Sequence, residues 1–252
     1  MHPDVPFSRH DVKSPVFARL RPCISEVSLP TVSNMAIRLI IFDLDGTLVD
    51  SSTDIANALN TAGNIFGMSP VTVREAEGLI GGGLTALIDR LLLLQGISID
   101  RRALLKGFLD AYSSHLTDHT RPYPRVTETL VALDGITKAV LSNKITSFTV
   151  EIVRRFGWTG FFGSIQGGDT IAAKKPAPTA VLNLLADLKV RKEEAIIVGD
   201  SLYDIEAGRN AGIHTVAALY GYGSPGFDAN AEFRVRAFEE VLTIVEKLDK
   251  GA

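Results

Sequence analysis

The chain has 252 residues, a net charge of −3 and a hydrophobic content of 46%. That length suffices for a large core with a smaller second domain, but the chain has no excess of basic charge for a nucleic-acid backbone. Its single cysteine, Cys23, cannot form an intramolecular disulfide, and no apolar run approaches the roughly 20 residues needed to cross a bilayer. We therefore expect a cytosolic globular protein with neither nucleic acid nor membrane as a partner.

Residues 1–34 contain several prolines and scattered charges but no helical or strand period. This composition predicts an unstructured N-terminal arm. The arm has no apolar signal-peptide core, and Met35 directly precedes the first apolar run. Met35 is therefore a candidate for the natural start.

Five apolar, β-branched segments with no helical period indicate strands that are buried on both faces. Helical patterns separate most of these segments, and such alternation is typical of an α/β fold with a Rossmann-like parallel sheet. The segments span residues 37–42, 137–143, 161–168, 195–201 and 214–220.

Residues 53–120 show helical patterns only, without a strand signal. This stretch is too long for a single crossover between adjacent strands. We predict an inserted helical domain at 53–120, with the α/β core formed by residues 35–52 and 121–252. The proline-containing return passage "TRPYPRV" suits a linker.

The first strand ends in "FDLDGT", which places Asp43 and Asp45 where open α/β sheets bind ligands. Two carboxylates this close raise each other's pKa unless a cation compensates, and Mg²⁺ is suited to that role. Asp-Gly is also a common turn, and Thr47 and Ser51 are also consistent with ordinary capping hydroxyls.

Three other segments carry polar groups where a strand ends or a loop is held by prolines. "IIVGDSLYD" offers Asp200 to a metal site and Asp204 in support, although Asp204 also suits a helix N-terminus. "VLSNK" offers Ser142 and Asn143 for phosphate oxygens or for a helix cap. "AAKKPAP" contains Lys174 and Lys175, either of which is equally consistent with a solvated loop lysine.

In their order, "DLDGT", "LSN", "KKPAP" and "GDSLYD" resemble the four motifs of the haloacid dehalogenase superfamily of phosphohydrolases, over roughly residues 36–250. The resemblance implies that Asp43 is the nucleophile and that Asp45 is the general acid and base. It implies Mg²⁺ ligands at Asp43, the main-chain carbonyl of Asp45, and Asp200. The remaining expected site residues are Ser142, Asn143, Lys175, Gly46 and Thr47 around the phosphoryl group, with Asp204 in support.

Within the superfamily, "DGTLVDSSTDIANALN", "GGDTIAAKKPAP" and "LYGYGSP" look similar to the phosphoglycolate phosphatase branch. The inserted domain would then be a cap whose loop, Gly81, Gly82 and Gly83, offers backbone amides to a small anionic substrate. A flexible helix connection is the alternative reading of this loop. We expect a magnesium-dependent phosphatase acting on 2-phosphoglycolate, monomeric or homodimeric. A phosphomutase, a pyrophosphatase or nucleotidase, and a non-catalytic binding module are the alternatives.

Overall fold

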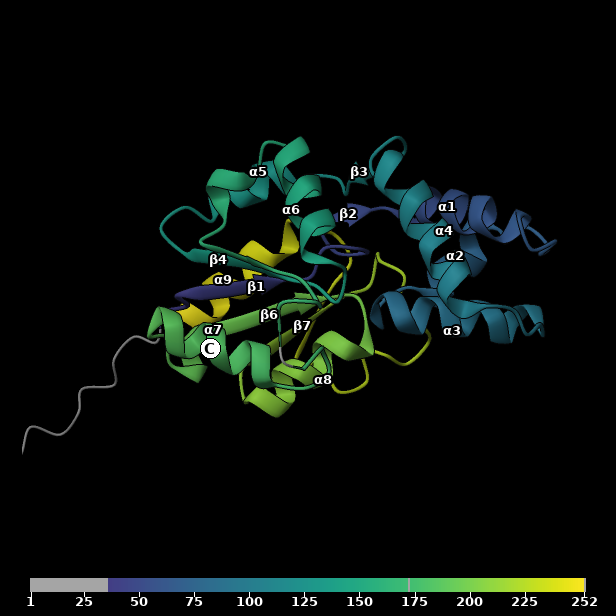
Figure 1. Ribbon diagram of the computed structural model, residues 1–252. Helices are drawn as coiled ribbons and strands as arrows, with labels where there is room; N and C mark the ends of the chain where they lie inside the picture. Colours follow the sequence, from purple (N-terminus) through teal and green to yellow (C-terminus); the bar gives the residue numbers. More distant parts are fainter. Residues whose placement is uncertain (1–35, 172, 252) are drawn as a thin grey trace, which may run out of the picture. The chain divides into compact units, whose positions relative to one another are not determined.

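The computed structural model describes residues 36–171 and 173–251 (Figure 1). The arm expected at residues 1–34 lies outside the described residues. The strands are β1 (Leu39–Phe42), β2 (Val49–Asp50), β3 (Arg121–Pro122), β4 (Thr137–Leu141), β5 (Ser164–Gln166), β6 (Ala195–Gly199), β7 (His214–Ala218) and β8 (Phe233–Val235). The α-helices are α1 (Ser52–Asn64), α2 (Val73–Leu79), α3 (Gly83–Gln95), α4 (Arg101–Ser114), α5 (Val126–Ala132), α6 (Thr146–Arg155), α7 (Thr179–Leu188), α8 (Leu202–Ala211) and α9 (Glu240–Asp249).

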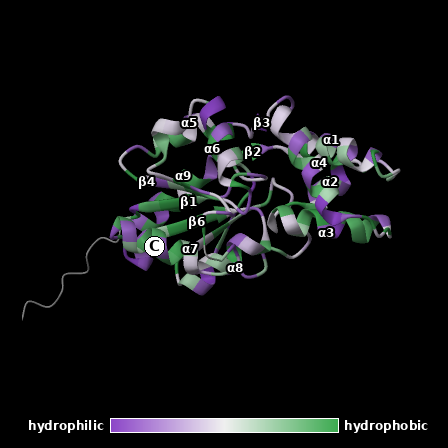
Figure 2. Ribbon diagram, in the orientation of Figure 1, coloured by the Kyte–Doolittle hydropathy of each residue, from purple (hydrophilic) through white to green (hydrophobic). Residues whose placement is uncertain are grey.

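The main sheet has six strands in the order β5-β4-β1-β6-β7-β8, and every neighbouring pair is parallel. Strand β1 is interior to the sheet, and all four of its residues are fully buried. Figure 2 shows β1 and β6 in the hydrophobic colour. This arrangement confirms the predicted Rossmann-like α/β class, because strands buried on both faces need continuous apolar sequence.

Side chains on the two faces of β1 pack in two separate hydrophobic clusters. Ile40 and Phe42 pack in the cluster that includes residues of α5, α6 and α9. Leu39 and Ile41 pack in the other, with residues of α7 and α8. Figure 1 shows α5 and α6 on one side of the sheet and α7 and α8 on the other. Alternating side-chain direction along a strand therefore anchors both helical layers on one four-residue element.

Helices α1 to α4 lie between β1 and β4 in the sequence, and α1 packs mainly against α4. Two short strands that the sequence analysis missed, β2 and β3, pair antiparallel where the chain enters and leaves this helical cap. Val49 is opposite Pro122, and Asp50 is opposite Arg121. The two passages into the cap are thus fastened side by side.

Strand β8 was also missed by the sequence analysis. It pairs parallel with β7 at one end of the sheet order. Within the described residues, no helix combines the length and the apolar character that a membrane span would need.

Candidate active site

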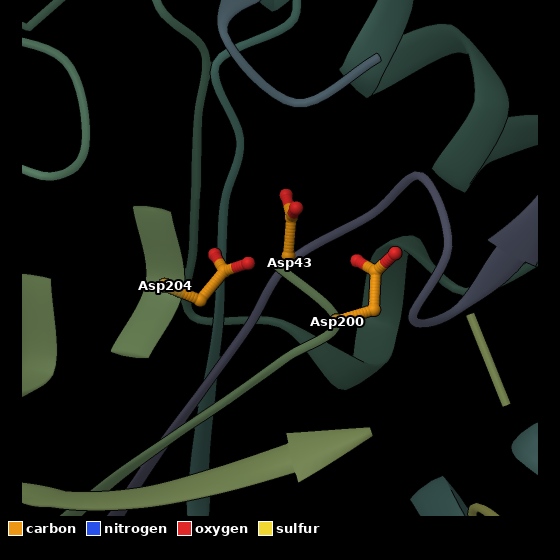
Figure 3. Close-up of side chains that lie close together, drawn as sticks. All are labelled: Asp43, Asp200 and Asp204. Carbon is orange, nitrogen blue, oxygen red and sulfur yellow. The ribbon is translucent and has the colours of Figure 1, made fainter. Parts of the chain in front are cut away.

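The carboxyl ends of β1 and β6 bring three buried aspartates together, as Figure 3 shows. Asp43 follows β1, Asp200 follows β6, and Asp204 lies in the first turn of α8. One carboxylate oxygen from each lies within 4.8 Å of the others. Parallel strands collect these side chains because their carboxyl ends meet at one edge of the sheet.

Burial and mutual repulsion make the negative charges of these aspartates energetically unfavourable. Burial, assisted by repulsion from Asp204 and Asp45, raises the pKa of Asp43 to about 7 although Lys175 lowers it. Burial and the charges of Asp43 and Asp204 likewise raise the pKa of Asp200 well above its ordinary value. The cluster therefore needs more positive charge than the protein side chains supply.

Lys175 provides part of that charge from the loop before α7. Its ammonium group lies 3.0 Å from Asp43 Oδ1 and donates hydrogen bonds to Asp204 Oδ1 and the Leu141 carbonyl, each at 2.6 Å. Burial opposes the charge on Lys175, but Asp204 and Asp43 outweigh it and raise its pKa. Lys175 thus remains a cation between two of the three aspartates.

The donor set fits a divalent cation. Four buried carboxylates line this region, those of Asp43, Asp45, Asp200 and Asp204, against two buried ammonium groups, those of Lys144 and Lys175. If all six are ionised, two negative charges are in excess. Carboxylate oxygens are ligands for hard divalent ions, and Asp43 and Asp200 both offer such oxygens. Lys175 contacts Asp43, whereas the hydrogen-bond donors to Asp200 are Thr47 and the Tyr222 amide.

Asp45 lies apart from this cluster, in a hydrogen-bonded setting of its own. Its Oδ1 accepts a hydrogen bond from Ser51 Oγ at 2.5 Å, and both of its carboxylate oxygens lie 3.0 Å from Lys144 Nζ. Ser51 stands at the N-cap of α1, yet its side chain makes no capping hydrogen bond. The Ser51 hydroxyl, which the sequence analysis considered as a possible helix cap, therefore binds Asp45 instead.

Lys144 also contacts the cap. Its Nζ lies 4.7 Å from the ring centroid of Tyr112, in α4. Burial opposes its charge, but the Asp45 carboxylate outweighs this and raises the pKa of Lys144 above its usual value. Burial raises the pKa of Tyr112 to about 12. At neutral pH the pair is therefore an ammonium and a neutral phenol, both able to donate hydrogen bonds.

Gly46 and Thr47 shape the loop after Asp45. Gly46 has φ +83°, and a Cβ there would lie 2.0 Å from Asp200 Oδ2. Its amide donates to the Val49 carbonyl, while Thr47 Oγ1 donates to Asp200 Oδ1 at 3.2 Å. These contacts favour a positioning role for both residues, with Gly46 leaving the room that Asp200 occupies.

Asn143 joins the core to the cap loop. Its side-chain amide donates to the Gly81 carbonyl at 2.9 Å and to the Lys175 carbonyl at 3.0 Å, and its Oδ1 accepts from the Lys175 amide. Its side chain thus supports the Lys175 loop. Ser142 is buried, and its Oγ accepts a hydrogen bond from the Lys144 amide at 3.2 Å.

The three cap-loop glycines allow close packing on the core. A Cβ on Gly81 would lie 3.3 Å from the Tyr203 ring, and one on Gly83 would lie 2.8 Å from the Asn143 carbonyl oxygen. On Gly82 it would meet Ala86 of its own helix at 2.7 Å and the Tyr203 hydroxyl at 3.1 Å. The lack of side chains at these three glycines therefore allows the cap loop to pack closely against the core.

A cavity of about 60 Å³ lies where these parts meet. It is bordered by Asp43, Asp45 and Ser142 from the core and by Tyr112 and Gly83 from the cap. Most of its remaining lining is apolar: Ile55, Ile80, Leu84, Leu87, Phe108, Ile145 and Phe148. A cavity of only about 10–15 Å³ by this measure already holds one water, so this cavity has room for several such groups and suits a small molecule.

The sequence was compared with family models and with known proteins. Residues 40–218, more than half of the chain, match the family model described as haloacid dehalogenase-like hydrolase. The chain belongs to the haloacid dehalogenase-like hydrolases. It is therefore an enzyme of a hydrolase family, and the cluster of three buried aspartates fits the divalent metal that phosphatases of this family generally use.

Among its relatives in that family, the chain is 40% identical over 188 residues to a phosphoglycolate phosphatase of Aquifex aeolicus, covering 74% of this chain and 86% of the relative. It is 34% identical over 224 residues to one from Psychrobacter arcticus, covering 85% and 96%. The crystal structure of a predicted phosphoglycolate phosphatase from Haemophilus somnus 129pt superposes with a TM-score of 0.79 at 29% identity, covering 85% of this chain and 99% of that one. These similarities confirm the predicted branch of the family.

Two residues that border the cavity were not among the functional candidates from the sequence. Lys144 stood inside the quoted motif "VLSNK", directly after Asn143, and this adjacency was the available signal. Tyr112 lies in one of the helical patterns of residues 53–120, which gave no sign of a functional role. His115 and His119, late in the helical cap, are exposed, with side-chain exposures of 66% and 58%.

Proposed function

We propose that this hydrolase is a magnesium-dependent phosphatase that hydrolyses a small phosphomonoester, 2-phosphoglycolate, through an aspartyl phosphate on Asp43. The observation that carries the proposal is the cavity of about 60 Å³ that Asp43 and Asp45 border. The relatives named phosphoglycolate phosphatase, two of them 34% and 40% identical, support the choice of substrate.

Asp43 is the proposed nucleophile. Its carboxylate attacks phosphorus and displaces the alkoxide, so hydrolysis is divided into formation and breakdown of an aspartyl phosphate. Attack by an anion on an anion requires compensating charge, and Lys175, 3.0 Å from Asp43 Oδ1, already supplies one positive charge. Lys175 thereby orients Asp43 and would stabilise the phosphoryl oxygens.

Asp43, Asp200 and the main-chain carbonyl of Asp45 would hold the magnesium ion. When bound, the ion supplies positive charge that offsets the aspartates and the phosphate dianion. The buried Asp204, which bonds Lys175 at 2.6 Å and also forms a capping box with Ser201, would keep the lysine in place. Gly46 and Thr47 would hold Asp200 in position from the neighbouring loop.

Asp45 is the proposed general acid and base. In the first step its carboxyl group gives a proton to the leaving alkoxide, and in the second it removes a proton from the water that attacks the aspartyl phosphate, a role typically worth about 10²–10⁴-fold in rate. Ser51 Oγ and Lys144 Nζ hold this carboxylate at the cavity wall. Ser142, which also borders the cavity, would donate its hydroxyl to a phosphoryl oxygen.

The apolar lining of the cavity favours a small substrate over a sugar phosphate or a nucleotide. Hexose hydroxyls placed against Leu84, Leu87 and Phe108 would lose hydrogen bonds to water without replacement. A phosphomutase or a nucleotidase remains the alternative function, and release of free phosphate with a ranking of substrates distinguishes them. The cytosolic location and the monomeric or dimeric state stay predictions.

The test is phosphate release by the full-length protein with Mg²⁺ from 2-phosphoglycolate, glucose 6-phosphate, a nucleoside monophosphate and pyrophosphate. We expect the highest kcat/KM for 2-phosphoglycolate. Asp43→Asn should abolish turnover while preserving the melting temperature within a few degrees, because the amide keeps the shape but cannot attack phosphorus. A higher kcat/KM for any of the other three substrates would contradict the substrate assignment, and turnover by Asp43→Asn within about tenfold of wild type, about 1.4 kcal/mol in barrier, would contradict the mechanism.

A further inference from the structure

The Tyr112 hydroxyl is buried without a hydrogen-bond partner among the residues that the structure describes. Tyr112 is 1% exposed, and its ring is fixed by Phe108, stacked at 5.4 Å, and by Phe148, edge-on at 5.4 Å. A buried hydroxyl without a partner is costly, and native proteins rarely keep one without a reason. The residue borders the active-site cavity, so a molecule in that cavity could supply the missing acceptor.

Lys144 borders the same cavity and has donor capacity left over. An ammonium group has three N–H donors, and the two oxygens of Asp45 account for two of them at 3.0 Å. The ammonium lies over the Tyr112 ring. A phenol and an ammonium side by side form a donor pair that suits an anionic oxygen.

The rest of the cavity wall narrows the choice of ligand. The cap contributes the start of helix α3 at Gly83, where the positive end of the helix dipole favours an anion. Its other contributions are largely apolar, including Ile80, Leu84 and Leu87. One small anionic group therefore finds donors beside Tyr112 and Lys144, whereas a polyhydroxylated group does not.

We propose that Tyr112 and Lys144 bind the carboxylate of the substrate, and so select phosphomonoesters that carry a carboxylate close to the phosphate. This inference rests on the proposed phosphatase function and assigns to two residues the selection of its substrate. Tyr112 belongs to the cap and Lys144 to the core, so the carboxylate would contact both parts at once. Tyr112 and Lys144 are then specificity residues, distinct from Asp43 and Asp45.

Binding of two non-hydrolysable ligands to the full-length protein with Mg²⁺ tests the assignment by calorimetry. The first ligand is 3-phosphonopropionate, in which a methylene replaces the ester oxygen of 2-phosphoglycolate; the second is propylphosphonate, in which a methyl group replaces the carboxylate. We expect wild type to bind the first about tenfold more tightly or better, as hydrogen bonds to a charged group imply. Tyr112→Phe and Lys144→Met should each reduce that ratio at least about threefold.

Matched controls separate recognition from packing. Tyr123→Phe removes a phenol whose ring packs against Tyr220, and Lys138→Met removes a buried lysine that donates to the Leu133 and Ile136 carbonyls at the other end of β4. Both controls should keep the wild-type ratio. Neither Tyr123 nor Lys138 borders the active-site cavity.

The outcomes are distinct. Equal binding of the two ligands by wild type, or an unchanged ratio in both Tyr112→Phe and Lys144→Met, overturns the carboxylate assignment, as does equal weakening of both ligands. Phosphate release from 2-phosphoglycolate by wild type is scored separately. Its failure would contradict the proposed function, while the binding ratio would still decide whether these two residues recognise a carboxylate.

Discussion

Asp54 and Thr120, 66 positions apart in the sequence, tie together the two passages between core and cap. Asp54 Oδ2 accepts hydrogen bonds at 2.7 Å from both the amide and the hydroxyl of Thr120. The amide of His119 donates to the same carboxylate at 3.0 Å. Together with the β2–β3 pair, this carboxylate fastens the base of the cap.

Asp54→Asn should loosen this connection. Burial opposes ionisation of Asp54, but the hydrogen bonds from Thr120 and His119 outweigh it and lower the pKa of this carboxyl. The neutral amide weakens several of these bonds, and removing a buried partner of a charged hydrogen bond costs about 1–3 kcal/mol. We expect a lower melting temperature at pH 7 than in wild type.

The pH dependence checks the cause. A lowered pKa in the folded state stabilises the protein above the ordinary pKa of aspartate, about 3.9, and that stabilisation is lost as pH falls through the lowered value. The difference in melting temperature between wild type and Asp54→Asn should therefore shrink toward pH 3. Asp118→Asn, at a 47% exposed carboxylate paired with His115, is the control and should change the melting temperature little. A constant difference across the range would argue against the role of the Asp54 charge.

Removal of divalent metal should abolish phosphate release, and Mg²⁺ should restore it. Adding Mg²⁺ to metal-free protein should also raise the melting temperature, because the ion binds the folded state and offsets the charges of Asp43 and Asp200. Asp200→Asn should lose most of that increase in differential scanning calorimetry, since one carboxylate ligand is gone. Full turnover in excess chelator would rule out the proposed dependence.

Much of the fold was predictable because the buried strands have a recognisable apolar sequence. A strand covered on both faces must be apolar throughout, and Ile40 to Phe42 obey this rule. Strand β8 escaped because it is three residues long and includes the exposed Arg234. Pairing between β2 and β3 escaped because two-residue strands carry no period, and their register depends on the cap that separates them.

The aspartates of the candidate site follow strands directly, so Asp43 and Asp200 could be placed near each other from the sequence alone. The contact of Lys144 with Asp45, and that of Tyr112 with Lys144, could not be placed in this way. Lys144 ends the motif "VLSNK" without any local sign of its partner, and Tyr112 lies among the apolar positions of a helical pattern. Their contact with each other depends on how α4 packs beside the segment after β4, and no local pattern records that packing.

Gly83→Ala should weaken substrate binding more than it changes stability. Gly83 has φ +81°, and a Cβ there would lie 2.8 Å from the Asn143 carbonyl oxygen and 3.1 Å from Lys174 Nζ. The methyl group would hold the cap loop away from the core. We expect KM for 2-phosphoglycolate to rise about tenfold, equivalent to about 1.4 kcal/mol of binding.

Gly67→Ala supplies the matched control. Gly67 also lies in the cap with a positive φ, +67°, but a Cβ there would meet nothing within 4 Å. Both variants carry a similar backbone strain, of order 1 kcal/mol, and only Gly83→Ala adds the clash with the core. Equal KM values for the two variants in steady-state assays would show that contact at Gly83 does not govern seating of the cap.

Asp45→Asn should separate the two chemical steps. The amide cannot protonate an alkyl leaving group, so turnover of 2-phosphoglycolate should fall by about 10²-fold or more. The aryloxide of an aryl phosphate leaves without that proton, so Asp43 should still take up the phosphoryl group, and breakdown of the aspartyl phosphate should be slow because no base activates water. Intact-mass spectrometry should then find one added phosphoryl group on Asp45→Asn and none on Asp43→Asn. Asp50→Asn, at an exposed carboxylate in the neighbouring strand β2, should behave like wild type, and rapid steady turnover of 2-phosphoglycolate by Asp45→Asn would refute the acid-base role.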